Sequence, residues 1–180
     1  MRAQTLLSIA LLFSFTAAFA AAQKEKRQPL TDVQIEKIRE AGIEPDARIK
    51  LYAQFAGEHV ETIKGLTPRI RSAARAKRMD DELQDLSALM DELGSNLDQY
   101  GERKADLRKS LKWLSEQSKQ WLETLNAIPP EPAFDLSRKE AVDSGKDLAD
   151  QVTQMLKDQT SYFDLHKDEA GQDRAEPKPQ

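Results

Sequence analysis

The chain has no cysteine among its 180 residues and only two histidines, His59 and His166. Disulfide bonds, thiolate nucleophiles, cysteine-based zinc sites and a lipid-modified cysteine are therefore excluded. Neither histidine stands in a Glu-x-x-His or His-Glu-x-x-His pattern, so the spacings of a di-metal bundle and of a zinc protease are missing. His59 falls on an apolar stripe, where a packed and hydrogen-bonded histidine is the simpler interpretation.

The sequence also lacks a Gly-x-Ser-x-Gly nucleophile elbow and a glycine-rich phosphate-binding loop. Its net charge of −4, from 27 Lys and Arg against 31 Asp and Glu, argues against general binding to nucleic acid. The acidic residues at 80–85 are expected to point apart on a helix and to form surface pairs rather than a cation site. We therefore expect no enzymatic activity, no metal or cofactor, and no nucleic-acid partner.

A long apolar run occurs near the start of the chain, where residues 1–20 have the pattern of a secretory signal peptide. Arg2 supplies the positive charge, residues 6–15 supply a short apolar segment, and small residues allow cleavage after Ala20 or Ala22. An uncleaved membrane anchor is the competing interpretation, but the apolar run is short for a span and is interrupted by serines. We therefore expect an exported protein, periplasmic or secreted, with no membrane span after cleavage.

The remainder of the chain divides into a linker, one domain and a tail. Residues 21–29 form a polar linker, and residues 169–180 lack an apolar anchor and are expected to be a disordered tail. Residues 30–168 carry recurrent apolar positions at helical spacing and are expected to form a single helical domain.

Capping signals mark the first short helix of that domain. Thr31 and Gln34 have the spacing of a capping box, and Gly42 fits the residue that follows a helix end. The next helix begins near residue 45 and carries a second apolar stripe, Leu51 and Phe55, which is wide enough to hold the first helix.

The strongest pattern in the chain is a heptad seam. Apolar residues alternate by four and three positions over residues 79–128, which predicts a continuous central helix over residues 68–128. A turn at 64–68 would precede it, although one longer helix kinked at the proline is the alternative. Gly94 and Gly101 leave two possibilities open. They either break the helix and give a compact four-helix bundle, or form a row of small residues that lets a neighbouring helix approach closely.

A last helix is expected over residues 137–167, after a proline-rich loop. The fold class is therefore all-α: an elongated antiparallel helical bundle built on a long heptad-patterned central helix. Pairing the helices about their connections places Tyr52 beside Met79 and Lys104 beside Gln159.

Three surface features are candidates for function. The middle of the central helix would be less covered, which would leave an exposed apolar strip for a partner or for self-association: Leu86, Met90, Leu93 and Leu97. Trp113 lies off the seam and is a candidate partner anchor, unless the loop that carries Phe134 covers it. The third feature is either a contact for anionic surfaces or a solvated face neutralised by nearby acids: Arg71, Arg75 and Arg78.

Leu30-Thr31-Asp32-Val33-Gln34 resembles the LTxxQ motif of the Spy/CpxP family of periplasmic helical chaperones. The resemblance implies an extracytoplasmic helical chaperone, and those chaperones generally carry the motif twice, whereas this chain has it once. The capping box explains the same residues without the family. Residues 80–86 and 90–98 are similar to the core of a group of exported bacterial helical proteins, a likeness that implies no particular activity.

These observations favour a non-enzymatic extracytoplasmic helical protein that acts through protein–protein contacts, as a scaffold or an envelope-associated interaction module. The alternative is a Spy/CpxP-like periplasmic holdase chaperone. A scaffold should expose one defined patch, whereas a holdase should expose a concave apolar surface. A homo-oligomer is compatible with both.

Overall fold

The computed structural model describes residues 28–171. Within that range the chain forms five α-helices and one short 3-10 helix, without strands: α1 (Asp32–Glu40), α2 (Pro45–Leu66), α3 (Ala73–Glu102), α4 (Arg108–Asn126), α5 (Asp135–Leu165) and η1 (Lys167–Glu169). The predicted all-α class is confirmed. The predicted signal peptide, most of the linker and the tail beyond residue 171 lie outside the described residues.

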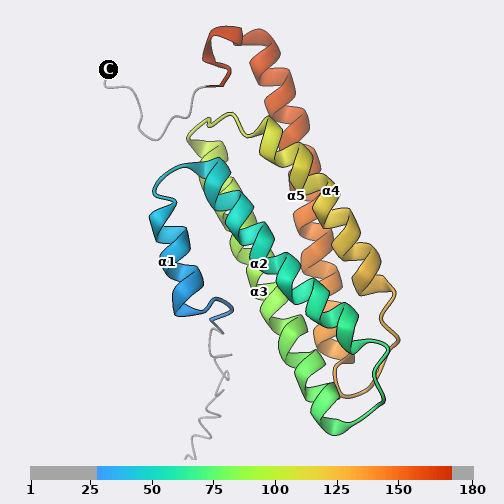
Figure 1. The fold of residues 1–180 in the computed structure, drawn as a ribbon. Coiled ribbons are helices and arrows are strands. Elements are labelled where there is room, and N and C mark those ends of the chain that lie inside the picture. The colour runs from blue at the N-terminus through green and yellow to red at the C-terminus, as the bar shows by residue number, and fades with distance from the viewer. Residues whose placement is uncertain (1–27, 172–180) are drawn as a thin grey trace, which may run out of the picture.

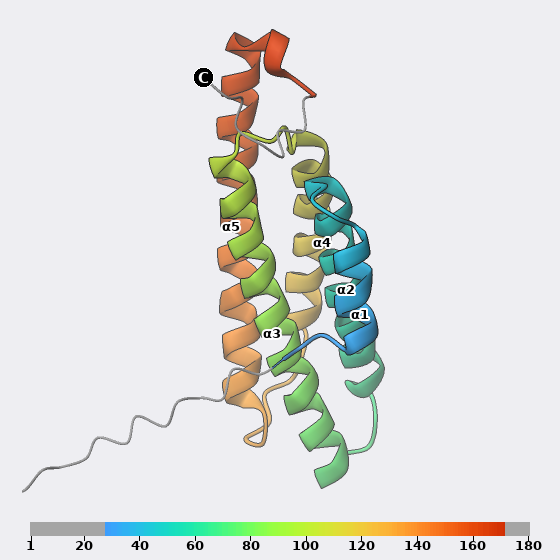
Figure 2. The same ribbon diagram turned by 90° about the vertical axis from the view of Figure 1, so that its left-hand side faces the viewer.

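The short first helix forms as its capping signals predict. The Thr31 side chain accepts the backbone N–H of Gln34, and the Gln34 side chain accepts the backbone N–H of Thr31, so the capping box is complete. Gly42 follows the helix with a φ of 63°, a left-handed conformation that favours glycine. Ile43 is exposed and makes no hydrophobic cap. Figures 1 and 2 show α1 on the outer side of α2, the helix on which it packs.

The four long helices lie side by side and enclose the core (Figure 1). α2 and α3 run in opposite directions, since Tyr52 donates to Glu92 near one end and His59 pairs with Glu82 farther along. The prediction that Tyr52 lies beside Met79 is wrong. The connection between the two helices is longer than the sequence indicates, and this shifts the pairing along α3.

α3 and α5 run in the same direction and contact each other through polar residues spaced one heptad apart. Ser87 Oγ lies 2.7 Å from Ser144 Oγ, and the Gln151 side chain donates to the carbonyl of Gly94 at 2.9 Å. A Cβ on residue 94 would lie 2.7 Å from Gln151 Oε1. The predicted role of the small residues, close approach of a neighbouring helix, is therefore confirmed at Gly94.

The continuous central helix predicted over residues 68–128 is wrong, and the alternative holds: the chain breaks just after Gly101, and four long helices pack together. α3 ends at Glu102 and α4 begins at Arg108, and Lys104 between them has a φ of 57°, which breaks the helix. α3 packs against α2 and α5, and α4 also packs against α2 and α5, so α3 and α4 occupy opposite corners of the bundle. The segment 103–107, the crossover loop, therefore passes over one end of the core (Figure 2).

The connection between α2 and α3 is a loop, the alternative favoured over a kinked helix, but it covers residues 67–72 and so lies later in the chain than the predicted turn at 64–68. The Thr67 hydroxyl donates to the carbonyl of Ile63 and so belongs to the end of α2. Ser72 caps α3 by accepting the backbone N–H of Arg75 at 3.2 Å. Ile70, which falls inside the helix predicted over residues 68–128, is 92% exposed in this loop.

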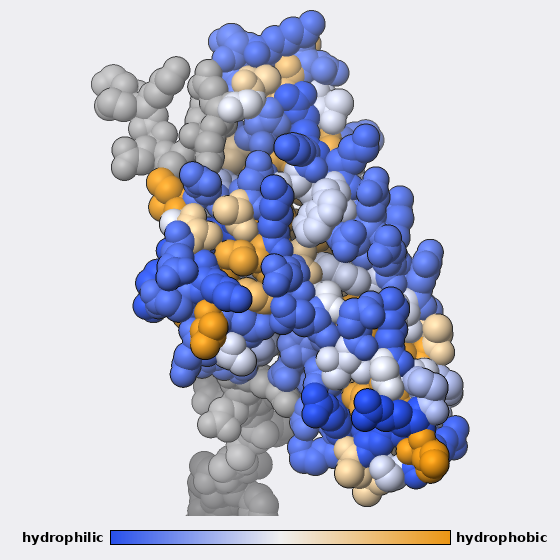
Figure 3. Space-filling view, in the orientation of Figure 1, coloured by the Kyte–Doolittle hydropathy of each residue, from blue (hydrophilic) through white to orange (hydrophobic). Residues whose placement is uncertain are grey.

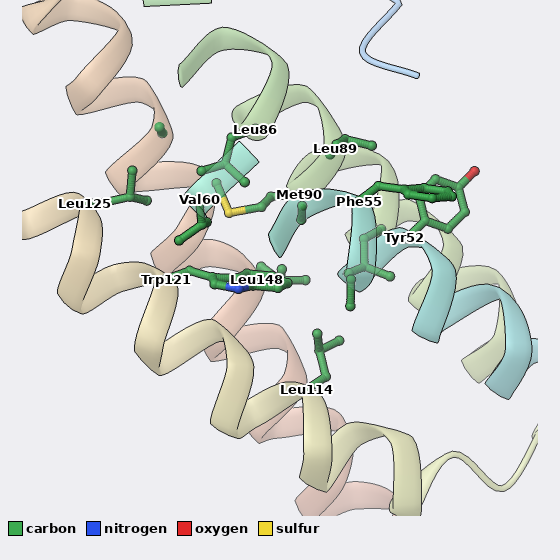
Figure 4. Packing of buried hydrophobic residues seen from close by; sticks show 14 of the residues in the cluster. Tyr52, Phe55, Val60, Leu86, Leu89, Met90, Leu114, Trp121, Leu125 and Leu148 are labelled. Carbon is green, nitrogen blue, oxygen red and sulfur yellow. The ribbon is translucent and has the colours of Figure 1, made fainter. Parts of the chain in front are cut away.

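The core combines side chains from α2, α3, α4 and α5. Figure 4 shows residues of all four helices converging on the space between them, among them Val60, Met90, Trp121 and Leu148. The α3 residues of the heptad seam point into this space, which is why the seam is so regular.

Candidate interaction surface

The predicted apolar strip is not on the surface. Leu86, Leu93 and Leu97 are 0% exposed and Met90 is 1% exposed. The expectation that these four residues form an exposed contact site is wrong, because α2 and α5 both cover α3 along this stretch. Their role is to fill the core.

The three arginines predicted to share a basic face have different environments. Arg71 and Arg78 are largely exposed, with side-chain exposures of 75% and 64%. Arg75 is buried, and its guanidinium donates to the carbonyls of Leu66 and Thr67. The predicted basic face is therefore wrong, because its middle residue belongs to the interior.

Arg75 ties together two loops at one end of the bundle. Its Nη1 lies 2.8 Å from Glu131 in the α4–α5 loop, and its Cζ lies 5.8 Å from the ring centre of Phe134. Phe134 is 1% exposed. This aromatic residue, predicted as a possible cover for Trp113, thus packs beside Arg75.

Trp113 is the one predicted partner contact that remains on the surface, at 37% exposure. It lies in the second turn of α4, on a face of that helix turned away from the core. We call this surface the α4 outer face, and its residues are Lys109, Lys112, Trp113, Glu116 and Gln120.

The charges of the α4 outer face are unpaired within the described chain. Lys112 and Glu116 stand four residues apart, a spacing that favours an ion pair, yet no ion pair joins them, and Lys109 has none with another described residue. The equally spaced Lys77 and Asp81 on α3 do pair, at 2.7 Å. The sequence does not predict this difference, since the same four-residue spacing favours an ion pair on both helices.

Other exposed apolar side chains are dispersed. Figure 3 shows isolated apolar spots on a largely hydrophilic face. They occur in the first helix, in two loops and at both ends of α5: Val33, Ile43, Ile70, Leu136 and Leu165.

A polar groove of about 1050 Å³ runs over the outer side of α3, with residues of α2 and α5 along its edges. Tyr52 lies in it and donates to Glu92 at 2.7 Å. Burial, with the hydrogen bond to Glu92, raises the pKa of Tyr52 to about 12. The phenol therefore stays protonated and acts as a donor throughout the ordinary pH range.

A second polar cluster lies where the crossover loop meets α4. Arg108 donates to both carboxylate oxygens of Asp106, at 2.9 and 2.8 Å, and the backbone N–H of Gly171 donates to the same carboxylate. Hydrogen bonding from Arg108 holds the pKa of Asp106 below its usual value. Gly171 falls in the predicted tail, yet it contacts the helical domain here.

His59 has the packed environment that the sequence predicts. Its Nδ1 lies 2.7 Å from Glu82 Oε2, and both side chains are mostly buried. Over residues 28–171, no three His, Asp or Glu side chains converge as metal ligands. In the same range, every helix is too short or too polar to cross a membrane.

Comparison with known proteins gives no relative: no protein-family model, no curated protein and no solved structure matches this chain.

Proposed function

We propose that this protein is a non-enzymatic extracytoplasmic interaction module that binds a partner protein through the α4 outer face. The observation that carries the proposal is Trp113, a large aromatic residue that is 37% exposed on a helix whose other large apolar residues are buried or half-buried. Tryptophan is enriched among the residues that contribute most to binding between proteins.

The surroundings of Trp113 support the same proposal. Lys109, Lys112 and Glu116 have no ion-pair partner among the described residues, so a partner protein can engage them without breaking an existing pair. Charges at the rim of an apolar anchor steer association and set specificity. The tryptophan would supply most of the affinity, and the flanking charges would select the partner.

The extracytoplasmic location rests on the pattern of residues 1–22, in which a positive charge, an apolar segment and small residues follow one another. The absence of cysteine is compatible with this location, because the fold is held by helix packing and is stable in an oxidising as well as in a reducing compartment.

A holdase chaperone of the Spy/CpxP type is the second candidate, and the single LTxxQ motif at the start of α1 is what favours it. The dispersed apolar residues on the described surface support a defined contact patch more than a broad client-binding surface. The two candidates differ in the number of proteins that they bind.

Photocrosslinking in the native host separates them. A benzoylphenylalanine probe replaces Trp113, and the matched control places the same probe at Leu136, which is 71% exposed on another helix. The proposal expects one stoichiometric adduct from position 113 and none from position 136. A broad smear of unrelated proteins from both positions would favour the holdase and contradict the proposed module.

A further inference from the structure

α1 is held to the rest of the fold by few contacts. It is 9 residues long, its one buried residue is Ile38, and among the described helices it packs on α2 alone. A helix of this length is not stable by itself in water. The surface of α2 beneath it therefore keeps α1 helical.

The polar contacts between α1 and α2 are long. The Gln34 side-chain amide donates to Glu58 at 3.3 Å, and Arg48 donates to the carbonyls of Ile38 and Gly42 at 3.5 and 3.3 Å. These distances lie at or beyond the upper limit of the usual N–H···O range, so each bond is weak.

The surface of α2 beneath α1 has an apolar centre between two charged residues. Arg48, Leu51, Phe55 and Glu58 follow one another at intervals of three or four residues and therefore share one face of α2. The two end residues bond to α1, which means that Leu51 and Phe55 between them face it. Phe55 is 1% exposed and is one of the largest fully buried side chains. We call this surface the α2 groove.

The position of α1 in the chain allows it to leave without disturbing the bundle. It precedes the four long helices and is joined to them only by residues 41–44, where Gly42 has a φ of 63°. Such a short connection with a glycine can act as a hinge. No other described helix has to move when α1 swings away, because α1 packs on α2 alone. Leu30, directly before α1, is 8% exposed in the core and has to leave together with it.

We propose that α1 is a displaceable strap and that the α2 groove is a docking site for an amphipathic helix of a partner protein. The chemistry of that helix follows from the present occupant. It carries two apolar residues spaced like Ile35 and Ile38, a hydrogen-bond donor for Glu58, and free carbonyls at its C-terminal end for Arg48. This groove is separate from the α4 outer face, so the inference stands or falls independently of the proposed function.

The absence of cysteine allows a specific test. Gln34→Cys and Glu58→Cys, introduced together, provide the only two thiols, and a short bis-maleimide reagent then locks α1 onto α2. The probe is a fluorescent synthetic peptide with the sequence of residues 28–44, and binding is followed by fluorescence anisotropy. The peptide is expected to bind the double variant before crosslinking and to bind at least tenfold more weakly after it.

A second variant loosens the strap and leaves the groove intact. Ile38→Asp places a charge at a buried position of α1, so a larger fraction of molecules is open, and the peptide is expected to bind at least tenfold more tightly than it binds the native chain. Val33→Asp changes an exposed residue of the same helix and should leave the affinity unchanged. Circular dichroism verifies that each variant stays folded. If Ile38→Asp does not fold, Leu30→Asp replaces it, because Leu30 is buried directly before α1 and also holds this segment on the bundle.

Equal binding to the locked and unlocked forms would overturn the proposal, as would a loosened variant that binds no more tightly than the native chain. The unlocked protein could also form a dimer that dissociates on crosslinking. That result would show that α1 of a second copy occupies the α2 groove, and it would overturn the proposal of a different partner protein.

Discussion

The side-chain oxygen of Gln159 accepts the backbone N–H of Leu107 at 2.8 Å. The amide nitrogen of the same side chain donates to the carbonyl of Ala105 at 2.9 Å. One residue of α5 therefore satisfies two buried backbone groups of the crossover loop. The loop can cross the end of the core only because these groups have partners, since unpaired buried backbone groups are costly.

Replacing Gln159 with leucine should lower the free energy of unfolding by about 2–4 kcal/mol, because both backbone groups lose their partners in an apolar environment. Urea denaturation of the two proteins measures this change. Gln154→Ala is the matched control on the exposed side of α5 and should change stability by less than about 0.5 kcal/mol. Equal effects of the two substitutions would show that Gln159 does not support the loop.

Two glycines should respond in opposite directions to the same substitution. A Cβ at either Gly42 or Gly57 would meet no atom within 4 Å, so crowding plays no part at either position. Gly42 has a φ of 63°, and Gly42→Ala should destabilise the protein by about 1 kcal/mol. Gly57 lies inside α2, and Gly57→Ala should stabilise by about 0.5–1 kcal/mol. Thermal unfolding of both variants gives the sign of each stability change. If both substitutions changed stability in the same direction, backbone conformation would not decide the outcome.

The burial of Arg75 predicts a large effect of its removal. Arg75→Met deprives the carbonyl of Leu66 and the carboxylate of Glu131 of their donor, and it should cost about 3 kcal/mol. Arg78→Met removes an arginine that is 64% exposed and should cost less than about 0.5 kcal/mol. The midpoints of denaturant unfolding are compared for the two variants. Similar midpoints would indicate that Arg75, like Arg78, lies on an exposed basic face.

Asp106 should contribute to the loss of stability in acid. Hydrogen bonding from Arg108 lowers its pKa in the folded protein below the value of about 3.9 expected in the unfolded chain. The folded state therefore binds the proton less readily, and the stabilisation is present above about pH 4 and is lost as the pH falls through the folded pKa. Asp106→Asn should be less stable than the native chain at pH 6, and the difference should shrink towards pH 2. A difference that is constant over this range, measured by urea unfolding, would contradict the assignment.

The first short helix could be predicted because its signals are local. Thr31 and Gln34 satisfy each other across one turn, and Gly42 relieves backbone strain at its own position. The close approach at Gly94 was also predictable, since Gly94 lies one heptad from both Ser87 and Gly101, and such a row of small residues leaves room for a neighbouring helix.

The break between α3 and α4 was one of the two possibilities that Gly94 and Gly101 left open, but the sequence did not decide between them. Residues 103–107 contain neither glycine nor proline, and the left-handed residue is Lys104. The heptad positions on either side of Lys104, Tyr100 and Leu107, are buried at 5% and 1% exposure, so the apolar spacing spans a segment that is not helical. The mistaken continuous helix then led to the expectation of an exposed strip, whose leucines and methionine are in the core.

The exposure of Trp113 could not be predicted from the sequence. The heptad pattern shows only that Trp113 lies off the seam, and whether another residue covers it depends on where the α4–α5 loop packs. That loop contacts Arg75 through Glu131, a contact between residues distant in the chain. Local spacing carries no information about such contacts.

The central claim is that Trp113 anchors a partner protein, and the affinity of that partner tests it most directly. The protein captured by the crosslinker at position 113 is purified, and its binding to the native chain, Trp113→Ala and Leu136→Ala is measured by isothermal titration calorimetry. We expect Trp113→Ala to weaken binding by about 2 kcal/mol, roughly 30-fold, as for a central tryptophan anchor, and Leu136→Ala to leave it unchanged. An affinity that is the same for the native chain and Trp113→Ala would contradict the α4 outer face as the interaction site.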